Sequence, residues 1–247
     1  MLKRVIALVL MLVACGELRA QYTDGVTGLA TIPTAEMQQD GRFMGGAVYL
    51  PKDMLPSSWG YSSFRLRYFL NVTLFPFLEL SFVNTLRELP DIEGYAKFNQ
   101  DRALAMKLRL TRERGWLPAI AIGSSDLISR LDNYNALAQS EANRYFASHY
   151  VVATKGFRFC EDNMIGVTLG YSFSMSNSSE EYFDDTLFYG VNVRPNFAPY
   201  LQFMADVRGT KVSIGAAALL WDHLSLNLFC YDFKSPSGGL RYETTLF

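Results

Sequence analysis

The chain has 247 residues, a formal net charge of −1 and an aromatic content of 14%. This length fits one large domain or two small ones, and the balanced charge gives no support to a nucleic-acid partner. Past residue 20 the sequence contains no run of 18 or more apolar residues, which excludes a membrane-spanning helix from that part of the chain.

Residues 1–20 have the pattern of a signal peptide, because Lys3 and Arg4 precede an apolar stretch that ends at Val13. Two processing sites compete in this segment. Cleavage after Ala20 is the one we expect. The stretch 12–15 also resembles a lipoprotein site, which makes Cys15 a lipidation candidate. If the chain is cut after Ala20, Cys160 and Cys230 remain, and we expect both to be isolated thiols.

Residues 21–41 differ in character from the rest of the chain. Gly25, Gly28 and Pro33 interrupt this segment, and Thr34 is a candidate N-cap for a short helix. We expect a periplasmic N-terminal segment that either enters the barrel predicted below as a plug or covers its mouth as a cap.

Alternation of apolar and polar residues predicts twelve β-strands between residues 42 and 247. The run 165–173 is the clearest, with large apolar side chains at odd positions and glycine or polar residues between them. The predicted strands are 42–50, 61–74, 78–87, 101–112, 116–126, 145–157, 163–174, 186–194, 198–208, 211–220, 224–233 and 239–247.

The connections between these strands indicate the fold. Those after the even-numbered strands are brief, whereas 51–60, 88–100, 127–144 and 175–185 are longer and polar. Bacterial outer-membrane barrels have this plan, with the short turns in the periplasm. We therefore predict an all-β fold: a transmembrane, antiparallel, up-and-down β-barrel of about 12 strands over 42–247, with both termini periplasmic. The alternative is a soluble sandwich or lipocalin-like barrel.

Several blocks of sequence resemble YjbH-like proteins, a family of outer-membrane β-barrels associated with exopolysaccharide production and export. They are Gly25–Leu29, Ile32–Ala35, Leu74–Glu79, Asp101–Ala103, Met106–Leu110, Trp116–Gly123, Tyr150–Lys155 and Leu169–Tyr171. The resemblance implies an accessory role in making or exporting a surface polysaccharide. It supplies no catalytic residues.

The polar strand faces, when assigned to the lumen, carry more positive than negative charge. Glu79, Asp206 and Glu243 are the acidic members. The basic candidates are Arg65, Arg67, Lys107, Arg109, Lys155, Arg194, Arg208 and Arg241. A cationic lumen would attract an anionic polymer. The alternative is that these side chains fill a narrow barrel by pairing with carboxylates on neighbouring strands or on the N-terminal segment.

Enzymatic activity is not expected. The only histidines are His149 and His223, and His149 cannot act on Ser148 because adjacent strand residues point to opposite faces. The sequence has no metal-ligand cluster and no phosphate-binding loop, so we expect no cofactor.

The preferred hypothesis is therefore a non-catalytic barrel of the cell outer membrane that assists exopolysaccharide export. Its expected partners are outer-membrane lipid, an anionic polysaccharide and periplasmic export proteins. A small general porin or a structural barrel with partner-binding loops is the alternative, and a lipid-modifying enzyme is the least favoured.

Overall fold

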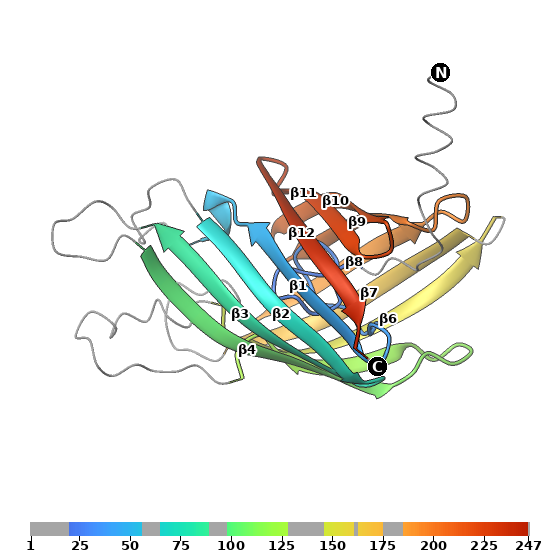
Figure 1. The fold of residues 1–247 in the computed structure, drawn as a ribbon. Coiled ribbons are helices and arrows are strands. Elements are labelled where there is room, and N and C mark those ends of the chain that lie inside the picture. The colour runs from blue at the N-terminus through green and yellow to red at the C-terminus, as the bar shows by residue number, and fades with distance from the viewer. Residues whose placement is uncertain are drawn as a thin grey trace, which may run out of the picture.

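The computed structural model is a closed barrel of twelve antiparallel strands (Figure 1). It describes residues 20–55, 65–88, 98–127, 146–160, 163–174 and 185–246. The strands are β1 Arg42–Tyr49, β2 Arg65–Phe75, β3 Leu78–Glu88, β4 Phe98–Thr111, β5 Ala119–Ser124, β6 Ser148–Phe159, β7 Asn163–Ser174, β8 Thr186–Arg194, β9 Leu201–Arg208, β10 Lys211–Leu220, β11 Leu224–Tyr231 and β12 Ser235–Thr245. The predicted all-β fold and its strand number are confirmed.

Each strand pairs with its neighbours in sequence, and the barrel closes between β1 and β12. Arg42 lies opposite Thr245 at one end of this seam, and Val48 lies opposite Gly239 at the other. The first strand therefore begins, and the last strand ends, at the same rim. We call it the short-turn rim, because β2 and β3 are joined there by residues 76–77 and β10 and β11 by 221–223. The opposite end is the long-connection rim.

The two faces of the wall differ as the alternation predicts. In β7, Val167, Leu169 and Phe173 are exposed, whereas Thr168 and Ser172 are buried in the interior. Other exposed side chains of the outer face are Leu70, Phe82, Leu110, Ile122, Leu187, Val191, Phe203, Ile214, Leu228 and Leu240. A soluble barrel would show the opposite distribution, so this surface is that of a transmembrane barrel.

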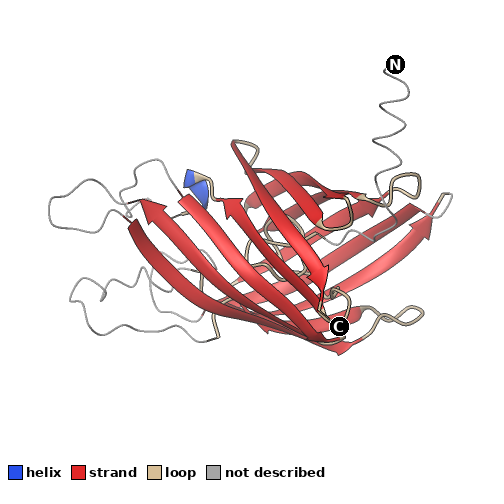
Figure 2. Ribbon diagram, in the orientation of Figure 1, coloured by secondary structure: helices blue, strands red, loops and turns tan. Residues whose placement is uncertain are grey.

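Residues 20–38 lie inside the barrel, where the ribbon shows a looped segment enclosed by the strands (Figure 2). We call this segment the plug. It folds back on itself through isolated bridges between Gln21 and Thr27 and between Gly28 and Pro33. The short helix predicted to begin at Thr34 is absent, because the backbone of this stretch bonds to the wall instead.

Apolar side chains of the plug complete the core of the molecule. Leu29 and Ile32 are buried in the same cluster as the wall residues Phe69 and Phe188. Gly25 has φ +79, and an added Cβ there would lie 2.4 Å from the Phe69 ring. A side chain at that position would therefore clash with the wall as well as strain the backbone.

No helix among the described residues is long and apolar enough to cross a membrane.

Candidate functional site

The plug is fixed to the wall by several groups of charged and polar residues, and these groups form the candidate site. The first is centred on Glu79 of β3 and Lys107 of β4, which are direct cross-strand partners. The Lys107 Nζ lies 3.1 Å from the Glu79 carboxylate and donates to the carbonyls of Thr27 at 2.9 Å and Glu36 at 2.7 Å. The carboxylate accepts from the Thr27 amide, the Thr27 hydroxyl and the Gln38 backbone amide, so both members of the pair also bond to the plug.

A second group lies toward the other end of the interior, on β9. The Asp206 carboxylate accepts from the amides of Ala30 at 2.8 Å and Thr31 at 3.2 Å, and also from the Thr31 hydroxyl. Arg208, two residues along the same strand, donates to the Thr31 carbonyl at 3.3 Å. Asp206 and Arg208, which occupy successive inward positions of β9, thus hold residues 30–31, which we call the tip of the plug.

A third group joins the start of the plug to β2. Asp24 forms an ion pair with Arg67, and both side chains are only 1% exposed. Tyr22 donates to Asp24, and its hydroxyl oxygen lies 3.0 Å from that of Ser125. Burial, reinforced by the Asp24 charge, raises the pKa of Tyr22 above its ordinary value of 10.0. This phenol therefore remains a proton donor under all physiological conditions.

Further contacts attach the rest of the plug. Glu36 pairs with Arg194 of β8. The Ala35 amide donates to the Thr154 hydroxyl at 2.9 Å, and the Ala20 amide donates to the Gln202 side chain at 3.3 Å. Together these contacts connect the plug to strands on several sides of the barrel.

Seven of the eight basic residues predicted for the lumen occupy the interior face, and each is bonded. Arg67, Lys107 and Arg194 form ion pairs with Asp24, Glu79 and Glu36, and Arg241 lies 3.1 Å from Glu243. The remaining three donate to carbonyls: Arg65 to Leu50, Arg109 to Pro76 and Arg208 to Thr31. Two of these carboxylates, Asp24 and Glu36, belong to the plug. The sequence-based comparison of charges considered only residues of the strands and therefore omitted them.

Lys155 is the exception, and its assignment to the lumen is wrong. In β6 the inward residues are Ser148, Tyr150, Val152 and Thr154, all buried. Lys155 is out of phase with them and lies on the outer face near the short-turn rim. There it pairs with Glu113 and donates to the Gly115 carbonyl at 2.7 Å.

Other sequence predictions have different outcomes. Cys160 and Cys230 are free thiols, as expected. The signal peptide up to residue 19, the lipidation candidate Cys15 and most of the long polar connections lie outside the described residues. Within the described part of the chain, no group of three His, Cys, Asp or Glu side chains could hold a metal ion.

The fold and the enclosed segment define the class of protein: a transmembrane-type β-barrel with a lumen filled by its own N-terminal plug. The chain belongs to the family described as exopolysaccharide biosynthesis protein YbjH, whose model matches residues 20–185. The expected family resemblance is therefore confirmed.

Individual proteins also show similarity to this chain. An uncharacterized lipoprotein YjbH of Escherichia coli (strain K12) is 31% identical over 114 residues, or 44% of this chain. The matched part covers 14% of the length of that relative. Among solved structures, an outer membrane channel from Pseudomonas putida F1 has a TM-score of 0.42 and 13% identity, covering 86% of this chain and 98% of that one.

Proposed function

We propose that this protein is a non-catalytic barrel of the outer membrane that assists export or surface assembly of exopolysaccharide, with its lumen closed at rest by the plug. The short-turn rim faces the periplasm in this proposal, so both ends of the barrel wall are periplasmic. Periplasmic export proteins supply the energy, and an anionic glycan is the cargo.

One observation carries this proposal: charged side chains are buried inside the barrel, and apolar side chains cover its outer face. Large apolar side chains are exposed over the outer face, whereas Arg67, Lys107 and Glu79 are at most 1% exposed inside. Such a wall is stable only where lipid surrounds it, and a closed barrel leaves no unpaired strand edge in that lipid. Membership of an exopolysaccharide biosynthesis family supports the nature of the cargo.

The plug determines how a glycan could pass. Its apolar side chains pack against the wall, and its charged residues neutralise wall residues that would otherwise attract a polyanion. Export through the lumen therefore requires displacement of the plug, which would expose Arg67, Lys107, Arg194 and Arg208 together. Displacement would convert a filled, neutralised interior into a cationic path.

A purely structural barrel is the second candidate, and it is favoured because each of the seven interior bases already has a partner within the protein. In that case the plug never leaves, and the barrel serves to present its long connections to partners. A permanently open porin is not supported, because residues 20–38 occupy the interior.

A plug that can be locked by oxidation separates these two candidates. The side chains of Thr31 and Asp206 are in direct contact, so a cysteine at each position brings two thiols within reach of one another. The pair should be made in a Cys160→Ser, Cys230→Ser background and expressed in polymer-producing cells that lack the native protein. Surface polysaccharide is then measured under oxidising and reducing conditions.

If the plug must move, oxidation abolishes surface polysaccharide and reduction restores it in the same protein. The control is the Cys160→Ser, Cys230→Ser background alone, which should be insensitive to redox conditions. Normal export from the locked protein would rule out passage through the lumen and favour the structural barrel. Normal export from cells without the protein would refute both.

A further inference from the structure

A connected group of polar side chains lies on the outer face of the wall, where apolar residues are the rule. It consists of Tyr68 on β2, Asn84 on β3, and Gln100 and Arg102 on β4, and we call it the outer polar cluster. The register places Tyr68 opposite Asn84 and Asn84 opposite Arg102. Their neighbours Arg67, Thr85 and Ala103 are buried in the interior, so these four side chains point outward.

Hydrogen bonds connect the members across three strands. The Asn84 side-chain amide donates to the Tyr68 hydroxyl and, at 3.4 Å, to the Gln100 carbonyl oxygen. Arg102 donates to the same Gln100 oxygen from two nitrogens, at 2.9 and 3.3 Å. The group is therefore organised as a unit and does not consist of independent surface residues.

The cluster retains unused bonding capacity in an apolar setting. The adjacent row of the outer face is Leu70, Phe82 and Leu104, and Phe82 is 41% exposed. A guanidinium has five N–H donors, and among the described residues Arg102 bonds only to Gln100. Asn84 is 2% exposed, yet its carbonyl oxygen has no partner. A lipid-facing charge is costly deep in a membrane, so a ligand must compensate it or the headgroup layer must surround it.

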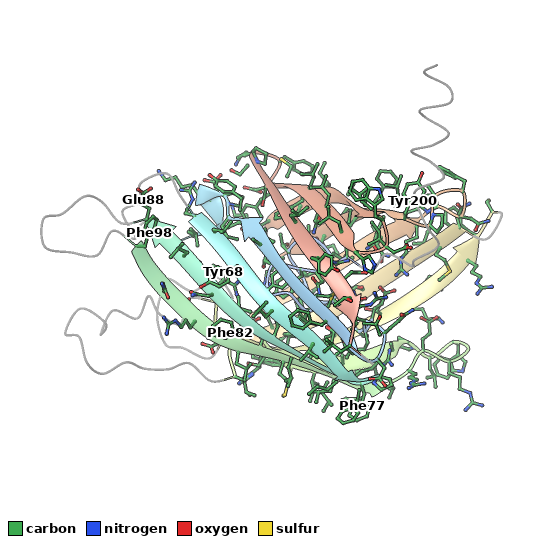
Figure 3. The ribbon with its side chains drawn as sticks, viewed as in Figure 1. Tyr68, Phe77, Phe82, Glu88, Phe98 and Tyr200 are labelled. Carbon is green, nitrogen blue, oxygen red and sulfur yellow. The ribbon has the colours of Figure 1, made fainter. Side chains whose placement is uncertain are left out.

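The position along the strands indicates which layer this is. β4 begins at Phe98 on the long-connection rim, and Arg102 follows four residues later. Figure 3 shows Phe98 and Glu88 at this end of the wall and Phe77 at the opposite end, with Tyr68 and Phe82 between them. In the orientation proposed above, the long-connection rim is extracellular, so the cluster lies toward the outer leaflet.

We propose that the outer polar cluster binds the phosphorylated headgroup of an outer-leaflet glycolipid. This inference rests on the proposed outer-membrane location. Arg102 matches a phosphate because a guanidinium donates two parallel hydrogen bonds to it. The Tyr68 hydroxyl and the Gln100 amide suit sugar hydroxyls beside that phosphate, with Asn84 holding both in place. The exposed apolar row below accepts the acyl chains.

Binding of a defined glycolipid by the full-length protein tests this inference. The protein is placed in phosphatidylcholine nanodiscs, and diphosphoryl lipid A is titrated in and followed by native mass spectrometry. Arg102→Leu should weaken lipid A binding at least tenfold, whereas Arg102→Lys should lose less because it keeps the charge. Lys234→Leu is the matched control, since Lys234 is an exposed base in the 232–234 turn of the same rim, and it should bind like the parent.

Two further measurements keep the test decisive. Dephosphorylated lipid A and phosphatidylglycerol separate a phosphoglycolipid site from a general site for anionic lipid. A double variant, Tyr68→Phe with Gln100→Leu, keeps Arg102 and should weaken lipid A binding by a smaller factor, about threefold to fivefold. If Arg102→Leu fails to fold, the double variant tests the site in its place. Folding of each variant is checked by the change in gel migration on heating.

Equal binding of phosphatidylglycerol and lipid A, unchanged binding by Arg102→Leu, or no binding by the parent would each overturn the inference. A protein that does not enter nanodiscs at all would refute the membrane location and with it the proposed function. A protein that enters them but ignores lipid A refutes the glycolipid site alone.

Discussion

Glu79 and Lys107 face each other across β3 and β4 inside the barrel, with 3.1 Å between carboxylate and ammonium and no solvent exposure of either side chain. Both also bond to the plug, so one ion pair joins two strands and a third segment. Taking two charges out of water is costly, and the pair is stable only because its remaining donors and acceptors are satisfied.

Replacement of one partner should therefore be severe. We expect Lys107→Met to lower the free energy of unfolding by about 3–5 kcal/mol, because it leaves the Glu79 carboxylate buried without its counter-charge. Urea titration in detergent, monitored by tryptophan fluorescence, gives the measurement. Lys155→Met is the control, since its partly exposed pair with Glu113 should contribute at most about 1 kcal/mol. Equal losses in the two variants would contradict the interior and exterior placements.

Asp206 should control how firmly the tip of the plug is held. Asp206→Ala removes the acceptor of the Ala30 and Thr31 amides and the Thr31 hydroxyl. We expect single-channel openings in planar bilayers to become more frequent than in the parent, which should be mostly closed. Asp232→Ala, in an exposed turn, is the matched acidic control and should behave like the parent. Identical traces for all three proteins would show that this anchor does not govern conductance.

Gly190 on β8 should not tolerate a side chain. An added Cβ would lie 2.6 Å from the Leu29 side chain, 2.8 Å from the Ala205 carbonyl and 2.9 Å from the Asp206 Cβ. We expect Gly190→Ala to destabilise the protein by about 1–3 kcal/mol, since the backbone contact cannot yield. Gly156→Ala is the control, because its Cβ would meet nothing closer than 3.4 Å. Thermal unfolding of both variants in detergent should separate them clearly.

Tyr22 gives the protein a dependence on alkaline pH. Because its pKa is raised in the folded state, the folded protein keeps a proton that the unfolded chain releases near the ordinary value of 10.0. The stability contributed by this phenol is present below that pH and is lost as the pH rises above it. Denaturant titrations from pH 8 to about pH 11 should therefore show a smaller decline for Tyr22→Phe than for the parent. If the free energy of unfolding falls equally with pH in both proteins, the Tyr22 phenol is in contact with water and the proposed burial is wrong.

The strands were predictable because their two faces differ in polarity. The ranges 163–174, 186–194 and 211–220 coincide with β7, β8 and β10. The alternation of glycine or polar residues with large apolar ones is clearest in β7. Lys155 was misplaced for the converse reason. The inward face of β6 includes Tyr150 and Val152, so polarity did not distinguish the lumen from the exterior.

The plug contacts could not be read from the sequence. Asp24 pairs with a residue 43 positions away, and Glu36 with one 158 positions away, and no local pattern encodes such distances. The outer polar cluster did leave a signal. Arg102 has the same parity as Leu104, Met106 and Leu108, so the alternation already placed a charge on the apolar face.

The position of the plug ahead of β1 has a consequence for biogenesis. Its hydrogen-bonding partners on the wall range from Met44 to Asn227, so most of them emerge from the ribosome long after the plug itself. The β1–β12 seam is the last strand pairing that the chain can complete. A barrel that closed without the plug inside would leave buried charges of the wall unpaired. The plug must therefore reach the interior before this seam closes, so the order of these two events decides whether the buried charges of the wall find their partners.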